Sequence, residues 1–150
     1  PEQRALDLAE EENKVFEFFE AWAEEKAVAL RFVGSPCRVT GDPLMLRRAI
    51  SNLLSNAIRY TPAGQAVTIQ LSESAETVRL MVENPGTPIA AEHLPRLFDR
   101  FYRVDPSRQR KGEGSGIGLA IVKSIVGAHH GSVAAQSDLR STRFIVVLPK

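Results

Sequence analysis

A helix with a well-marked start and end, in the first half of the chain, constrains the fold more than any other feature. Asp42 suits the N-cap, where it accepts a backbone N–H, and Pro43 suits the first helical position because it has no donor to lose. The run Thr61-Pro62-Ala63-Gly64 ends the helix. Apolar residues recur at three- and four-residue steps between these limits: Leu46, Ala49, Ile50, Leu53, Leu54, Ala57 and Ile58. One face of this helix must therefore pack against a core.

The other segments mix helical and strand patterns. Helical patterns cover three further segments: residues 6–27, 92–102 and 116–129. Strand patterns cover five segments, of which the last two form a hairpin: residues 28–33, 67–71, 78–82, 132–136 and 142–148. Because helices and strands do not alternate strictly, we expect a two-layer α/β sandwich rather than a doubly wound parallel sheet.

The composition indicates one ordinary globular domain, with 150 residues of which 43% are hydrophobic and 25% charged. The net charge of +1 gives no general attraction to nucleic acid or to an anionic membrane. Cys37 is the single cysteine, which excludes a disulfide framework and fits a reducing compartment. No apolar stretch approaches the length of a membrane span. The chain starts at Pro1 without a signal-peptide pattern, so we expect one domain over residues 1–150, cut from a longer protein, with residues 1–8 as a linker.

A polar stripe runs beside the apolar face of the helix over residues 43–60. Arg48, Asn52, Asn56 and Arg59 follow one another at steps of four, four and three, so they share one face. Asparagine is a poor helix former, and two of them in mid-helix require a reason. One interpretation is a solvated face. The other is that the amide oxygens serve a hard cation while Arg59 meets phosphate charge.

Two loops carry further polar or glycine-rich patterns. The sequence GEGSGIGL at residues 112–119 has glycine at every second place and opens a helix, which suits backbone N–H contacts to a phosphate. It is neither a Walker A loop nor a dinucleotide fingerprint, and a flexible turn stays open as an alternative. Asn84 follows a strand and precedes a turn, where its side chain is placed to read a base edge or simply to form a loop.

Taken together, these elements resemble the Bergerat-type ATPase fold of histidine kinases, Hsp90-like chaperones, type II topoisomerases and mismatch-repair ATPases. The sequence NLLSNAIRYTP at residues 52–62 looks like the N box of histidine kinases, and VENPGTPI at residues 82–89 is similar to their first glycine box. LFDRFYR at residues 97–103 resembles the F box, and GSGIGL at residues 114–119 the second glycine box. More narrowly, residues 88–118 resemble the copper/silver branch of sensor kinases.

The resemblance implies an α+β fold with a mixed, mainly antiparallel sheet covered by about three helices, and a site for ATP and Mg²⁺. It implies that Asn56 helps to coordinate the Mg²⁺ with support from Asn52, and that Arg59 and Arg103 contact phosphate. Tyr60 then lies against the nucleotide, and residues 103–115 form a lid. The other implied nucleotide-binding positions are Asn84, Gly86, Ile89, Gly114, Ser115, Gly116, Ile117, Gly118, Leu119 and Thr142.

Several positions depart from the family pattern. Asn84 stands where most members have the aspartate that accepts the adenine amino group, and a neutral acceptor makes a weaker bond, so we expect retained but modest ATP binding. Pro88 and Ser141 replace glycines of the pattern. Asn52 stands where ATP-hydrolysing relatives carry a catalytic glutamate, so phosphoryl transfer is favoured over hydrolysis.

The resemblance also implies partners. The phosphate acceptor is then a histidine on a dimerisation domain before Pro1, because none of His93, His129 and His130 has the acceptor's sequence context. We expect a homodimeric inner-membrane parent kinase that holds this domain in the cytoplasm and phosphorylates a response regulator, while the fragment itself is monomeric. The basic residues of the expected lid favour a local phosphate role over nucleic acid. Two alternatives stay open: a non-catalytic nucleotide-binding module, and a protein-interaction domain.

Overall fold

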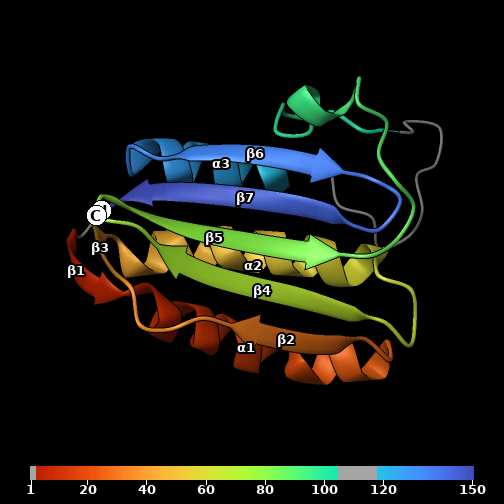
Figure 1. Cartoon of the computed structure of the whole chain (residues 1–150), viewed down its shortest axis with the longest axis horizontal. Coiled ribbons are helices and arrows are strands. Elements are labelled where there is room, and N and C mark those ends of the chain that lie inside the picture. The colour runs from red at the N-terminus through yellow and green to blue at the C-terminus, as the bar shows by residue number, and fades with distance from the viewer. Residues whose placement is uncertain (1–2, 105–117) are drawn as a thin grey trace.

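A five-stranded sheet forms one layer of the molecule and helices form the other (Figure 1). The computed structural model describes residues 3–104 and 118–150. The helices of this part of the chain are α1 (Leu8–Glu25), α2 (Pro43–Tyr60), α3 (Gly118–Ala128) and the short 3₁₀ helix η1 (Leu94–Arg96). Its strands are β1 (Arg4–Asp7), β2 (Ala29–Val33), β3 (Arg38–Gly41), β4 (Ala66–Glu73), β5 (Thr77–Asn84), β6 (Ser132–Ser137) and β7 (Thr142–Pro149).

The main sheet is mixed and mainly antiparallel, in the order β2-β4-β5-β7-β6. Of the strand pairs in the described residues, β2 and β4 alone are parallel, and β1 and β3 form a separate antiparallel ribbon. The three α-helices of the described residues cover one face of this sheet, and its other face is open (Figure 1). The two-layer α+β sandwich expected from the sequence is therefore confirmed.

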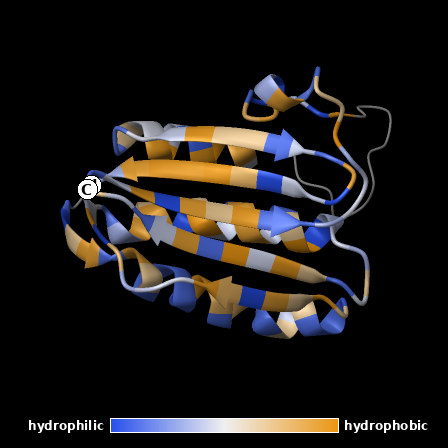
Figure 2. Cartoon of the chain, in the orientation of Figure 1, coloured by the Kyte–Doolittle hydropathy of each residue, from blue (hydrophilic) through white to orange (hydrophobic). Residues whose placement is uncertain are grey.

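The core lies between the sheet and the helices. Alternate residues of the strands point into it, as the alternating colours of β4 and β5 indicate (Figure 2). These inward residues are almost fully buried: Val67, Ile69, Leu71, Val78, Leu80, Val82, Phe144, Val146 and Leu148. The apolar stripe of α2 closes the core from the other side, with all seven of its predicted members buried.

Helix α2 has the predicted start and end. The Asp42 carboxylate accepts the backbone N–H groups of Leu44 and Met45 at 3.0 and 3.2 Å. At the other end the Thr61 hydroxyl donates to the Ala57 carbonyl at 2.7 Å. These caps fix where the polar stripe of α2 ends relative to the sheet.

The N-terminal segment differs from the sequence expectation. Residues 4–8 are not a linker, because β1 pairs with β3 and Leu6 and Leu8 are buried. The Asp7 carboxylate caps α1 through the Ala9 N–H and also accepts the Cys37 N–H, at 3.0 and 3.1 Å. Strand β3 has no counterpart among the predicted strands.

The segment over residues 92–102 also differs, since only η1 is helical there. Its backbone makes i→i+3 bonds such as Arg96 N–H to His93 carbonyl (2.9 Å) and Tyr102 N–H to Asp99 carbonyl (3.2 Å). Phe101 then takes a φ of +63°, which a right-handed helix cannot include. The expected helix is therefore a series of tight turns.

Helix α1 contains a fully buried carboxyl group. Neither side-chain oxygen of Glu12 has a hydrogen-bond partner among the described residues, and burial raises the pKa of Glu12 from 4.5 to about 7. The neighbouring Glu11 is paired with Lys14 at 3.1 Å and with Arg47 of α2 at 3.6 Å. In the described part of the chain, every helix is too short or too polar to cross a lipid bilayer.

Candidate functional site

The polar stripe of α2 lies beside the start of α3. Asn52 donates its side-chain amide to the Gly118 carbonyl at 3.2 Å, and a Cβ on Gly118 would lie 4.0 Å from the Asn52 amide carbon. Asn56 and Arg59 are half-buried, and neither side chain makes a hydrogen bond or ion pair with another described residue. A half-buried amide whose polar atoms have no partner in the described part of the chain is a candidate for binding a ligand.

The turn after β5 packs against the end of α2. Gly86 has a φ of +142°, and a Cβ there would lie 2.9 Å from the Tyr60 carbonyl oxygen. Only glycine accommodates both the conformation and the close approach. The turn and the last residue of α2 are therefore held together, with the Tyr60 side chain 53% exposed beside them.

Asn84 is buried at the end of β5, with 4% of its surface exposed. Its side-chain amide nitrogen donates to the Pro85 carbonyl at 2.8 Å. With this assignment of the amide, its oxygen is the atom left to accept a hydrogen bond from a ligand. The sequence predicted a polar group at this strand end, and the structure adds that it is buried and held by its own turn.

A chain of hydroxyl contacts joins this turn to the last hairpin. Thr142 pairs with Asn84 across β5 and β7, and its hydroxyl lies 2.8 Å from that of Ser137. The Ser137 oxygen in turn accepts the Ile89 N–H at 2.9 Å. Sequence reasoning missed Ser137. The signal was its inward position in β6, two residues after Ala135, where a hydroxyl needs a partner.

The Asp138 carboxylate stabilises the turn between β6 and β7. Asp138 accepts the N–H groups of Arg140 and Ser141 at 2.8 and 3.1 Å and pairs with Arg143 at 3.1 Å. The two backbone hydrogen bonds, with help from Arg143, lower the Asp138 pKa to about 2. Ser141 stands where the family pattern has glycine, and its hydroxyl donates to the Glu83 carboxylate of β5 at 2.7 Å. The serine therefore ties this turn to β5.

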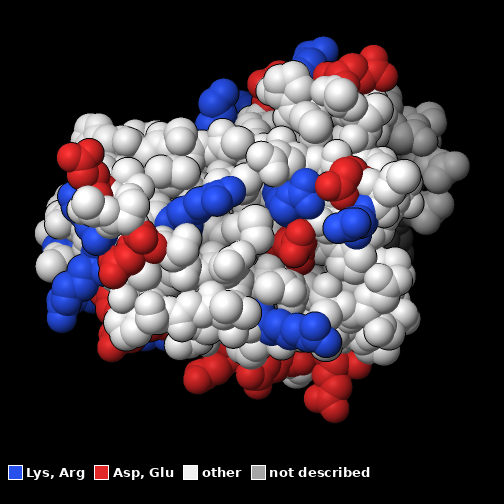
Figure 3. All heavy atoms as spheres, in the orientation of Figure 1, with Lys and Arg blue, Asp and Glu red and all other residues white. Residues whose placement is uncertain are grey.

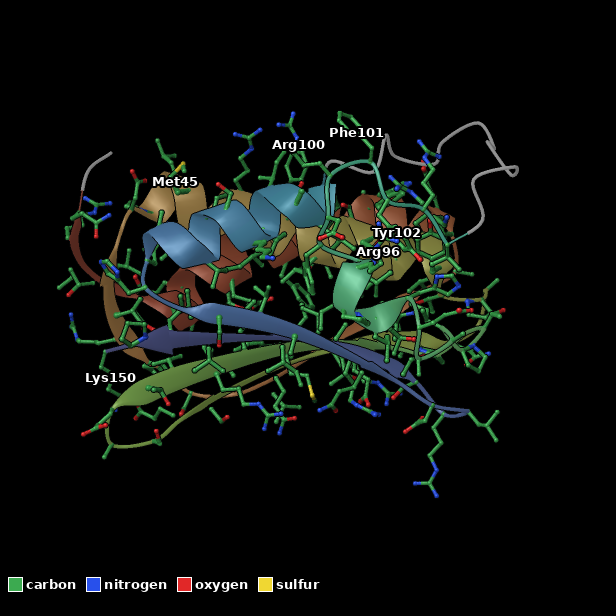
Figure 4. The ribbon with its side chains drawn as sticks, turned by 90° about the horizontal axis from the view of Figure 1, so that it is seen from above. Met45, Arg96, Arg100, Phe101, Tyr102 and Lys150 are labelled. Carbon is green, nitrogen blue, oxygen red and sulfur yellow. The ribbon has the colours of Figure 1, made fainter. Side chains whose placement is uncertain are left out.

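Aromatic side chains anchor residues 93–102, the segment that precedes the predicted lid in the chain. Phe98 is buried edge-on against Phe144 of β7, with ring centroids 5.9 Å apart. Tyr102 hydrogen-bonds His93, and the Arg96 guanidinium lies 4.7 Å from its ring centroid. In Figure 4, Arg96 and Tyr102 lie side by side, while Phe101 points away from the molecule.

Arg103, predicted to contact phosphate, is half-buried directly after this anchored segment. Leu119 is half-buried in the first turn of α3, and Gly118 is its exposed first residue. Residues 105–117 lie outside the described residues, and with them Gly114, Ser115, Gly116, Ile117 and most of the predicted lid. The structure thus brings together the end of α2, the turn after β5, the last hairpin and the start of α3.

His129 has a structural place at the other end of the helical layer. Its Nε2 accepts the Asp42 N–H at 3.0 Å, and its Nδ1 lies 2.8 Å from the Ile125 carbonyl. The two contacts fit a neutral imidazole with the proton on Nδ1. His129 therefore ties the end of α3 to the start of α2, away from the candidate site.

Residues 41–150 match the family of histidine kinase-, DNA gyrase B- and HSP90-like ATPases. The chain belongs to this family. Its ATPase domain accounts for the meeting of α2, β5, β7 and α3, and the fold expected from the resemblance is confirmed.

Curated relatives in this family are sensor kinases. Sensor histidine kinase CusS of Escherichia coli (strain K12) is 68% identical over 149 residues, which are 99% of this chain and 31% of the relative. The probable sensor kinase SilS of Salmonella typhimurium is 60% identical over 154 residues, covering 100% of this chain and 31% of the relative. The chain therefore spans about a third of the length of these relatives.

Solved structures of histidine kinases share the fold. Mycobacterial sensor histidine kinase MprB superposes with a TM-score of 0.86 at 27% identity, covering 99% of this chain and 97% of that one. The nucleotide-free catalytic domain of histidine kinase ThkA gives a TM-score of 0.88 at 25% identity and covers 100% and 99% of the two chains. The ATPase family and the histidine kinase fold are thus both established for this chain.

Proposed function

We propose that this chain binds Mg-ATP and donates the γ-phosphate to a histidine on the dimerisation domain of a two-component sensor kinase. The observation that carries the proposal is a pair of contacts that hold two segments, distant in the sequence, against helix α2. Gly86 packs on the Tyr60 carbonyl, and Asn52 bonds the Gly118 carbonyl. These contacts support the proposal, since they connect α2 with the turn after Asn84 and with the start of α3, within the fold of an ATPase family.

Asn84 is the candidate for holding the base. Its amide oxygen is left as an acceptor for an exocyclic amino group, because its nitrogen is tied to the Pro85 carbonyl. Thr142 lies opposite Asn84 on β7, and Gly86 and Ile89 belong to the same turn. The neutral amide accounts for the modest affinity that we expect.

Asn56, Arg59 and Arg103 are the candidates for the triphosphate and its metal ion. The amide oxygen of Asn56 is a hard ligand of the kind that Mg²⁺ prefers, and within residues 3–104 and 118–150 it has no hydrogen-bond partner, which fits that use. Bound ATP supplies the phosphoryl group, and the metal ion offsets its charge. The guanidinium groups of Arg59 and Arg103 then orient and neutralise the phosphates. Gly118 and Leu119 add the N-terminal end of α3, which favours negative charge.

Asn52 supports transfer over hydrolysis. Its side chain is engaged with the Gly118 carbonyl, and an amide cannot take a proton from water. We therefore infer slow ATP hydrolysis by the chain alone and efficient transfer only when an acceptor histidine is supplied.

The similarity to CusS and SilS supports a heavy-metal-responsive parent kinase. We infer that this parent is a homodimeric inner-membrane protein, that the present domain lies on its cytoplasmic side, and that its phosphoryl group passes to a response regulator. The chain by itself is then a monomer.

Phosphoryl transfer tests the proposal. The chain is mixed with labelled ATP, Mg²⁺ and a separately purified histidine-bearing dimerisation domain of the parent kinase. We expect label on the acceptor with wild type and with Arg79→Ala, a control on the open face of the sheet, and at least tenfold slower labelling with Asn56→Ala. If the wild type bound nucleotide without labelling the acceptor, a non-catalytic nucleotide-binding module would be favoured. If it neither bound nucleotide nor labelled the acceptor, a protein-interaction domain would be favoured.

A further inference from the structure

Helix α1 and the edge strand β2 form a step on the surface of the molecule. β2 is the last strand on its side of the sheet, and α1 lies behind and beyond it (Figure 1). The step borders a shallow, open hollow of about 490 Å³, which we name the α1–β2 groove. Its lining includes Phe16, Glu20, Ala23 and Glu24 of α1, followed by Val28 and Leu30. None of these residues belongs to the candidate nucleotide site.

The backbone along this edge has unused hydrogen-bonding groups. β2 pairs in parallel with β4, and the Ala29 N–H donates to the Gln65 carbonyl at 3.0 Å. In a parallel pair, alternate residues direct both N–H and C=O to the same neighbour. The backbone groups of Ala29, Arg31 and Val33 therefore face β4, whereas those of Leu30 and Phe32 face the open edge of the sheet, along which the groove begins at Leu30. Among the described residues no strand pairs with β2 on that side.

The groove combines an apolar floor with an acidic rim. Phe16 and Leu30 are half-buried and pack on the core, and Ala23 is buried between them in the lining. Glu20 and Glu24 lie one helical turn apart on α1, both exposed, and neither side chain makes an ion pair with any residue that the structure describes. Helix α1 is acidic as a whole, and acidic side chains gather along the edge of the molecule where it lies (Figure 3).

We propose that the α1–β2 groove binds an extended peptide of apolar and basic residues, which adds to the sheet as a strand beside β2. Backbone pairing with Leu30 and Phe32 supplies the attachment. Side chains that point toward α1 alternate with those that point away, so apolar side chains reach the floor and flanking lysines or arginines reach Glu20 and Glu24. Polar residues suit the outward positions beside Arg31.

Charge selects this occupant over a second copy of the chain. A two-fold β2–β2 contact would bring the acidic α1 against itself and Arg31 close to Arg31. An acidic rim likewise disfavours anionic lipid and nucleic acid. The proposal does not depend on ATP binding, because it uses other residues.

Amide protection tests the backbone contact. The probe is a synthetic peptide with threonine at alternate positions and lysine, valine, valine and lysine at the positions between them. We expect saturable binding and at least tenfold slower hydrogen exchange at the Leu30 and Phe32 amides, without a change at Arg31, which already bonds to β4. N-methylation of one alternate set of peptide residues should abolish binding, and methylation of the other set should leave it intact.

Charge reversal tests the rim. We expect Glu20→Lys with Glu24→Lys to weaken peptide binding about tenfold. The matched control is Glu17→Lys with Glu76→Lys, which makes the same charge change at exposed residues outside the groove and leaves affinity unaltered. Unchanged thermal unfolding shows that both variants are folded.

The peptide experiments overturn the proposal if there is no saturable binding at millimolar peptide, if protection maps to residues other than Leu30 and Phe32, or if both pairs of substitutions have an equal effect. Dimerisation through β2 in sedimentation, with no response to peptide, also overturns it. Because nucleotide affinity is measured separately, failure of the groove is distinguishable from failure of the kinase proposal.

Discussion

In the proposed function, Asn84 is the residue whose single acceptor atom sets the strength of nucleotide binding. Its burial at 4% exposure and its bond to the Pro85 carbonyl leave a neutral oxygen where the resemblance implies a carboxylate. A hydrogen bond to a charged acceptor contributes more than one to a neutral acceptor. We therefore propose that the identity of the residue at this position tunes nucleotide affinity without altering the fold around it.

We predict that Asn84→Asp tightens ADP binding about fivefold, because the charged acceptor contributes about 1 kcal/mol more. Calorimetric titration measures the change. Asn13→Asp is the control, since it makes the same chemical change at an exposed residue of α1 and should leave the affinity unaltered. An unchanged affinity in Asn84→Asp would show that Asn84 does not contact the base.

At the scale of elements, the turn after β5 depends on one glycine. Gly86 has a φ of +142°, and a Cβ at this position would lie 2.9 Å from the Tyr60 carbonyl oxygen. We predict that Gly86→Ala lowers the free energy of unfolding by about 1–3 kcal/mol and weakens nucleotide binding, because the turn must move away from α2. Urea unfolding and titration measure the two effects.

Gly127 provides the matched comparison. It is helical, and a Cβ there would meet nothing within 4 Å. Gly127→Ala should stabilise α3 by about 0.5–1 kcal/mol and leave nucleotide binding unchanged. If the two substitutions had the same effect, the close approach of Gly86 to α2 would have no energetic importance.

Helix α1 should make the stability of the fold depend on pH. The pKa of Glu12 is about 7 in the folded chain against an ordinary 4.5, so between these values folding takes up a proton. Its stabilising contribution is complete below pH 4.5 and is lost as pH rises through 7, in total about 3 kcal/mol.

We predict that Glu12→Gln removes this part of the pH dependence, because a neutral amide does not ionise. Urea unfolding of wild type, Glu12→Gln and the exposed control Glu17→Gln between pH 5 and 8 measures it. The wild type and the control should lose stability toward pH 8 relative to Glu12→Gln. Parallel curves for all three proteins would contradict a buried, protonatable Glu12.

At the scale of the whole molecule, the sequence predicted what local chemistry determines. Asp42 and Pro43 set the start of α2, and alternation predicted the core strands. Strand β3 was missed because it is four residues long and gains its pairing from β1, more than thirty residues away. The positive φ of Phe101 also has no local signal, because phenylalanine rarely adopts it.

The candidate site likewise combines features that have a local sequence signal with features that depend on long-range packing. The N box and the first glycine box were identified by their resemblance to the family, and helix spacing and turn chemistry left Asn56 and Asn84 with both a binding and a structural interpretation; their role in binding stays a prediction. The contact from Ser137 to Thr142 and Ile89 could not be predicted, because it depends on how the last hairpin packs beside the turn after β5. The exposed edge beside α1 is likewise a property of strand order, which no single segment encodes.

The central claim is that one end of this sheet forms an Mg-ATP site. Calorimetric titration with a non-hydrolysable ATP analogue, with and without Mg²⁺, on wild type and Asn56→Ala tests it most directly. We predict saturable binding that Mg²⁺ strengthens, and at least tenfold weaker binding, with little response to Mg²⁺, in Asn56→Ala. No binding by the wild type at millimolar nucleotide, or an Asn56→Ala variant indistinguishable from it, would contradict the account.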